Sequence, residues 1–129
     1  MESDVLVVDD SAAIRKILQR VLRQTGMAIH TIHEAGDGQQ ALTLLGTQTV
    51  DLILSDINMP KMDGLQMLAA LKASDQWRHI PVVMITTEGG ETKVAEAVKL
   101  GAAGYVRKPF TADQIKEKLA GIIEPARQL

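Results

Sequence analysis

Acidic, hydroxyl and amine side chains stand in this sequence at the points where hydrophobic runs end. The run "VLVV" leads into Asp9 and Asp10, "DLILS" leads into Asp56, "VVMI" leads into Thr86, and "GYVR" is followed by Lys108. If these runs are parallel strands, their carboxyl ends meet at one edge of a sheet, where ligands of such sheets bind. We therefore expect the five side chains to share one site.

The residue types at this edge indicate the chemistry. Three neighbouring carboxylates repel one another, and a divalent cation would let them stay charged. Oxygen donors without His or Cys favour Mg²⁺ over zinc. With Lys108 as a positive charge and Thr86 as a hydroxyl donor, the set suits transfer of a phosphoryl group, and Asp56 would be the nucleophile that becomes an aspartyl phosphate.

Each of these residues also has a simpler structural explanation. Asp10 could cap a helix, although Ser11 competes for that position, and Thr86 could be a cap as well. Asp56 alone is typical of a turn, and Lys108 alone is typical of a solvated surface. The combination favours the site, because separate accidents would have to place all of these side chains at one sheet edge.

The elements that must position these residues alternate between strand and helix five times. Strands are expected at residues 5–8, 29–34, 52–54, 82–85 and 104–106. Helices are expected near residues 14–22, 41–45, 65–71, 92–100 and 111–123. Three of the strands are continuous apolar runs, which is typical of a parallel sheet covered by helices on both faces, whereas 29–34 is more polar and suits an edge. The predicted class is α/β with a doubly wound sheet.

Length and composition limit the remaining possibilities. The 129 residues suit one domain spanning 1–129, with a core at about 4–123 and a tail at 124–129. A net charge of -2 argues against a nucleic-acid binder, and the absence of cysteine excludes disulfides and Cys-zinc sites. We see neither a membrane span nor a secretory signal, so we expect a cytoplasmic protein.

Four motifs carry a resemblance to a known family: "LVVDDS", "DLILSDINMPKMDG", "MITTE" and "GAAGYVRKPF". Together they resemble the receiver domain of bacterial two-component response regulators, of the stand-alone CheY-like chemotaxis kind. The resemblance implies a flavodoxin-like sheet in strand order 2-1-3-4-5 with five helices. It also implies a monomeric signalling switch, which catalyses only its own phosphorylation and dephosphorylation, receives its phosphoryl group from a histidine kinase and contacts a downstream protein.

The resemblance also implies roles for individual residues. Asp56 matches the phosphoacceptor, and Lys108 matches the lysine that contacts the phosphoryl oxygen. Mg²⁺ would be bound directly by Asp10, Asp56 and the backbone carbonyl of Asn58, and through water by Asp9. The Lys108–Pro109 peptide bond is expected to be cis.

Further implied roles concern the output of the switch. Thr86 and Tyr105 match a pair that moves on phosphorylation and alters the face formed by the fourth helix, fifth strand and fifth helix. Asn58 and Glu88 resemble residues that flank the attacking water and set the phosphoryl lifetime, although both could be ordinary polar loop residues.

The chain departs from motor-binding relatives at three positions. Gly90 and Glu91 stand where such proteins carry lysines, and Arg107 stands where an apolar residue is common. These differences put binding to the flagellar motor switch in doubt, so a phosphorelay receiver outside chemotaxis stays an alternative.

Two enzymatic alternatives are weaker. The segment "GDGQQA" at Gly36–Ala41 fits a dinucleotide-binding fingerprint, but it would leave the acidic residues, Thr86 and Lys108 without a role. An aspartate-nucleophile phosphatase would share the residue types, but its nucleophile normally ends the first strand, and the chain has no length for a cap domain.

Overall fold

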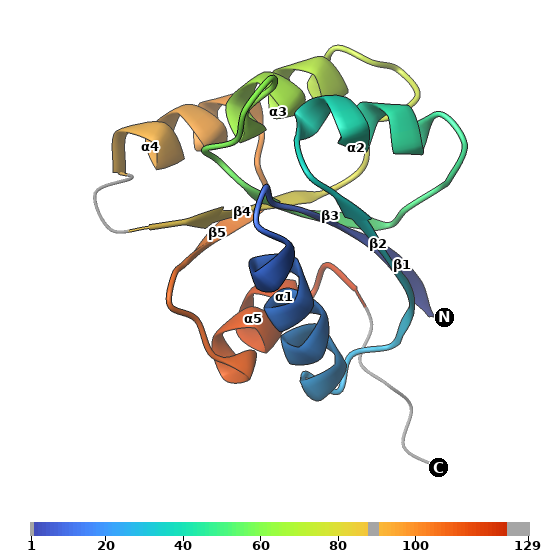
Figure 1. Cartoon of the computed structure of the whole chain (residues 1–129), viewed down its shortest axis with the longest axis vertical. Coiled ribbons are helices and arrows are strands. Elements are labelled where there is room, and N and C mark those ends of the chain that lie inside the picture. Colours follow the sequence, from blue (N-terminus) through green and yellow to red (C-terminus); the bar gives the residue numbers. More distant parts are fainter. Residues whose placement is uncertain (1, 88–90, 124–129) are drawn as a thin grey trace.

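The hydrophobic runs form a parallel five-stranded sheet in the order β2-β1-β3-β4-β5 (Figure 1). The computed structural model describes residues 2–87 and 91–123. The strands are β1 (Ser3–Val8), β2 (Ile29–Ala35), β3 (Leu52–Asp56), β4 (Val82–Thr86) and β5 (Gly104–Arg107). The helices are α1 (Ala12–Gln24), α2 (Gly38–Leu45), α3 (Gly64–Lys72), α4 (Glu91–Leu100) and α5 (Ala112–Leu119). The predicted fold class and strand order are confirmed, and β2 lies at an edge.

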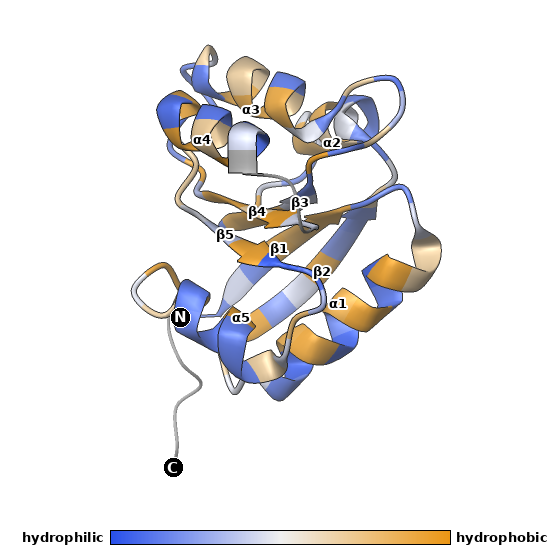
Figure 2. Ribbon diagram, turned by 90° about the vertical axis from the view of Figure 1, so that its left-hand side faces the viewer, coloured by the Kyte–Doolittle hydropathy of each residue, from blue (hydrophilic) through white to orange (hydrophobic). Residues whose placement is uncertain are grey.

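Helices cover both faces of the sheet, with α2, α3 and α4 on one side and α1 and α5 on the other (Figure 1). Successive residues of a strand point to opposite faces, so each buried strand supplies two cores. In β1, Leu6 and Val8 pack under α2 and α3, whereas Val5 and Val7 pack under α1 and α5. Figure 2 shows the resulting concentration of hydrophobic residues in the middle of the sheet. Packing on both faces of the sheet holds the ends of the strands at fixed positions.

Side-chain caps fix where several helices begin. Ser11 caps α1 by accepting from the backbone N–H of Ile14, so Asp10 is not the cap residue. Capping boxes begin α3 at Asp63 and α5 at Thr111, where the side chains of Gln66 and Gln114 accept from the backbone N–H of the cap residue.

The predicted end of the last helix is wrong. We expected α5 to carry Ile122 and Ile123, but the helix ends at Leu119. Gly121 has a φ of 87°, a left-handed conformation that glycine adopts without the steric cost of a Cβ. The chain therefore turns, and it still places Ile123 in the core beside Leu119.

No helix among the described residues is both long enough and apolar enough to cross a membrane.

Candidate functional site at the carboxyl ends of the strands

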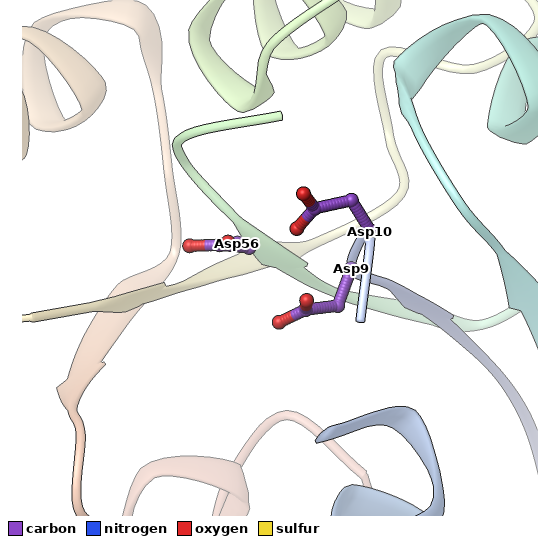
Figure 3. Close-up of side chains that lie close together, drawn as sticks. All are labelled: Asp9, Asp10 and Asp56. Atoms are coloured by element: carbon purple, nitrogen blue, oxygen red, sulfur yellow. The ribbon is translucent and has the colours of Figure 1, made fainter. Parts of the chain in front are cut away.

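Three aspartates converge beyond the ends of β1 and β3. Asp56 is the last residue of β3, and Asp9 and Asp10 directly follow β1, its neighbour in the sheet. Their carboxylates extend into the same space in Figure 3, and one oxygen from each lies within 4.8 Å of the others. We refer to these three residues as the acidic cluster.

Lys108 supplies the positive charge expected beside this cluster. Its Nζ lies 3.1 Å from Oδ2 of Asp9 and 3.7 Å from Oδ2 of Asp56. The Asp9 side chain is only 2% exposed and that of Lys108 19%, so the pair is poorly screened by water. Lys108 reaches this position because it directly follows β5, and its N–H donates to the carbonyl of Thr86 at the end of β4. Its bond to Pro109 is cis, as expected.

Burial is the main reason why the pKa of Asp56 lies above its ordinary value of 3.8. The nearby charges of Asp9 and Asp10 also raise this pKa, whereas the charge of Lys108 and the N–H of Ile57 lower it. The Ile57 N–H donates to Oδ1 of Asp56 over 2.8 Å, which leaves Oδ2 facing Lys108. Without a bound metal, the ionised form of Asp56 therefore destabilises the folded protein.

This raised pKa predicts how stability depends on pH without metal. A carboxyl whose pKa is higher in the folded state binds its proton more tightly there than in the unfolded state. Proton binding by Asp56 therefore adds its full contribution to folding stability below pH 3.8, and this contribution is lost as the pH rises through the pKa of the folded state. In EDTA, Asp56→Asn should therefore raise Tm at pH 7 by about 3 °C, and by less at pH 4. Thermal melts at both pH values measure this, with Glu117→Gln, on the exposed part of α5, as the control. Equal Tm values for wild type and Asp56→Asn at pH 7 would contradict it.

The donor set of the acidic cluster fits a hard divalent cation. Its ligands are carboxylate oxygens, the type that Mg²⁺ prefers. Their mutual repulsion, seen in the pKa of Asp56, would be relieved by a bound cation. The fit therefore supports a metal site at this edge of the sheet.

Two residues that sequence reasoning missed shape the loops around the cluster. Arg15 of α1 donates to the backbone carbonyl of Asp9 and forms an ion pair with Glu34 at 3.0 Å, so it ties the loop after β1 to β2. Gly64 begins α3 against the carbonyl of Asp56, where a Cβ would come within 2.4 Å of that oxygen. A side chain at this position would displace Asp56, so the glycine is required by close approach. Sequence alone gave no signal for the arginine, and it indicated only a turn at Gly64.

The predicted switch residues lie on neighbouring strands. Thr86 is 4% exposed, and it lies one residue past Ile85, the register partner of Asp56. Tyr105, on β5, is 37% exposed, and the ammonium of Lys118 lies 5.5 Å from the centre of its ring. The structure thus places a buried hydroxyl near the cluster and an exposed aromatic ring farther out on β5.

Asn58 lies just beyond Asp56, and its side-chain oxygen accepts a hydrogen bond from the ammonium of Lys93 on α4. Glu88 and Gly90 lie outside the described residues, as does the side chain of Glu91. The structure therefore describes one member of the predicted lifetime pair.

The glycine-rich segment Gly36–Ala41 forms the start of α2 rather than an open phosphate loop. Asp37 caps the helix by accepting from the N–H of Gln40, and the N–H of Gly38 donates to the carbonyl of Met62. A Cβ at Gly38 would lie 2.7 Å from the Met62 side chain, so this glycine is needed for packing. The dinucleotide alternative loses its support here.

The fold and the site together define a class: doubly wound α/β proteins with an aspartate cluster and a lysine at the carboxyl ends of their strands. The chain matches the family described as "Response regulator receiver domain" over residues 5–120. It is 40% identical over 120 residues to the chemotaxis protein CheY of Pseudomonas aeruginosa, covering 93% of this chain and 95% of that protein. The chain belongs to the response regulator receiver family, and it is a signalling domain.

Solved structures agree with this assignment. Chemotaxis response regulator CheY4 of Vibrio cholerae superposes with a TM-score of 0.83 at 32% identity, covering 95% of this chain and 100% of that one. The receiver domain of NtrX from Brucella abortus superposes with a TM-score of 0.82 at 31% identity, covering 92% and 97%. The similarity therefore extends to receivers whose names carry no mention of chemotaxis.

Proposed function

We propose that this chain is a phosphorylation-activated switch of the chemotaxis type, with Asp56 as its phosphoacceptor. One observation carries the proposal: Asp56 ends a buried strand with Oδ2 facing Lys108, inside a group of three carboxylates. The 40% identity to a chemotaxis protein CheY supports the pathway. The partners are then a histidine kinase and a downstream protein. A cytoplasmic location and a monomeric state stay predictions.

The positions of the side chains support the following transfer step. An oxygen of Asp56 attacks the phosphorus of a phosphohistidine, the P–N bond breaks, and the departing imidazole nitrogen takes up a proton. Lys108 lies where its ammonium can pair with a phosphoryl oxygen, and the Thr86 hydroxyl is the nearby donor on the adjacent strand. Hydrolysis removes the phosphoryl group again: water attacks the phosphorus, the bond to Asp56 breaks, and inorganic phosphate leaves.

The residues that would hold Mg²⁺ are Asp10, Asp56 and the backbone carbonyl of Asn58, with Asp9 acting through water. When bound, the ion would neutralise charge on the phosphoryl oxygens and so favour the attack by Asp56.

Output is expected through the face formed by α4, β5 and α5. Tyr105 is exposed there and stacks under Lys118, so a change in its position alters what this face presents. Thr86 would draw toward a phosphoryl group, and Tyr105 would move into the space that this change opens. The switch thus converts a charge at the strand ends into a surface change.

Tyr105→Ala should leave phosphorylation intact and reduce the ability of a partner to distinguish the two forms. We expect the phosphorylation rate to change less than about 2-fold, because Tyr105 lies away from the acidic cluster, while the affinity ratio between forms falls about 5-fold. Binding of the downstream partner protein to the phosphorylated and unphosphorylated forms of wild type and variant measures the ratio. An unchanged ratio in the variant would contradict the role of Tyr105.

Phosphotransfer tests the pathway. Autophosphorylated chemotaxis histidine kinase and the phosphotransfer domain of a hybrid kinase, both from the source genome, are each mixed with the protein. Faster transfer from the chemotaxis kinase supports our proposal, whereas transfer from the hybrid system alone would favour the phosphorelay alternative.

A further inference from the structure

Helix α4 is only lightly held against the rest of the molecule. Among its described side chains, residues 92–100, Ala97 is the fully buried one, and Val94 is half-buried. Val98 and Leu100 are exposed, at 58% and 37%. Burial of an alanine side chain contributes little free energy to holding α4 against the sheet. Each polar contact is therefore a substantial part of what positions the helix.

Lys93 makes such a contact directly at the rim of the site. Its ammonium donates to the side-chain oxygen of Asn58, on the loop that follows Asp56. The lysine is the third residue of α4, and a cation in the first turn of a helix opposes the helix dipole. Helix stability therefore does not account for a lysine at this position, whereas the contact across to Asn58 does.

The partner of Lys93 in this structure is a weak competitor for an ammonium group. Asn58 offers a neutral amide oxygen, whereas a phosphoryl group on Asp56, two residues earlier in the chain, would offer oxygens with a total charge near -2. Charge-assisted hydrogen bonds are stronger than those to neutral acceptors. The flexible lysine stem allows the ammonium to exchange one acceptor for the other.

We propose that Lys93, on α4, is a second phosphoryl-binding cation. Before phosphorylation its ammonium is bound to the side-chain oxygen of Asn58. When Asp56 is phosphorylated, the ammonium leaves the Asn58 oxygen for a phosphoryl oxygen and draws the start of α4 toward the site. This gives the helix its own response to phosphorylation, beside that of Thr86 and Tyr105. The inference rests on the proposed function, because it requires a phosphoryl group on Asp56.

Beryllofluoride, a phosphoryl mimic that binds carboxylates, tests this directly. Calorimetric titration in saturating Mg²⁺ should give an affinity about 4-fold weaker for Lys93→Met than for wild type, the size of one charge-assisted bond at an exposed rim. Lys93→Arg should recover most of the loss. Lys99→Met removes the same charge from the far end of α4, so it should bind as wild type does. Titration with Mg²⁺ alone should show no weaker binding in Lys93→Met.

Two results would overturn the inference and leave the proposed function standing. One is beryllofluoride binding by Lys93→Met as tight as by Lys99→Met. The other is equal weakening of Mg²⁺ and beryllofluoride binding, which would show that Lys93 only orders the Asn58 loop. If wild type binds neither Mg²⁺ nor beryllofluoride, the proposed function fails, and the role of Lys93 fails with it.

Discussion

Asp56→Asn is expected to abolish phosphorylation of the protein by acetyl phosphate in Mg²⁺. The amide cannot act as the nucleophile, and Asp9 is not placed to replace it, because its carboxylate is buried and paired with Lys108. The structural change is small, because asparagine has nearly the same shape and can still accept from the Ile57 N–H. The intact mass of wild type should increase by one phosphoryl group, and that of the variant should not change.

Asp51→Asn is the matched control, because Asp51 is an exposed aspartate at the opposite end of β3. It should be phosphorylated as wild type is. A phosphoryl group that persists on Asp56→Asn would refute Asp56 as the acceptor, provided that circular dichroism shows the variant to be folded.

Lys108→Met is expected to have opposite effects on phosphorylation and on metal binding. The rate of phosphorylation should fall about 100-fold, since a positive charge aimed at the transferred group is lost from a site that water screens poorly. Mg²⁺ should bind more tightly, because the cation that competes for Asp9 and Asp56 is gone. Stopped-flow phosphorylation and calorimetry measure the two effects separately.

Because the two effects have opposite signs, they distinguish the loss of a role in phosphoryl transfer from the loss of the folded structure. A variant that had merely lost its structure would lose both phosphorylation and Mg²⁺ binding. Lys16→Met, which removes a charge from an exposed position of α1, should change neither. Phosphorylation of Lys108→Met at the wild-type rate would exclude Lys108 from the transfer step.

The sequence was informative where chemistry coincides with the end of a strand. The apolar runs of β1, β3 and β4 can only be buried on both faces, so the residues that follow them had to meet at one edge. For this reason the sequence alone is enough to group Asp9, Asp10 and Asp56 at one site. Lys108 was placed by the same argument, one residue past β5.

Two kinds of feature escaped prediction: a local turn of the backbone, and contacts between segments that are distant in the sequence. Hydrophobic spacing continues through Ile122 and Ile123, so it could not show that Gly121 turns the chain after α5. The ion pair of Arg15 with Glu34 and the hydrogen bond of Lys93 to Asn58 join residues that lie 19 and 35 positions apart in the sequence. No local pattern encodes such pairs, because any exposed arginine or lysine on a helix has the same sequence signature.

The most direct measurement locates the phosphoryl group on the wild-type chain. Borohydride reduces an aspartyl phosphate to homoserine, which marks the acceptor in peptide mass spectra. After treatment with acetyl phosphate and Mg²⁺, we predict homoserine at position 56, and none when EDTA replaces the metal. Homoserine at position 9 or 10, or equal labelling of Asp56 without a divalent ion, would contradict a metal-dependent transfer to Asp56.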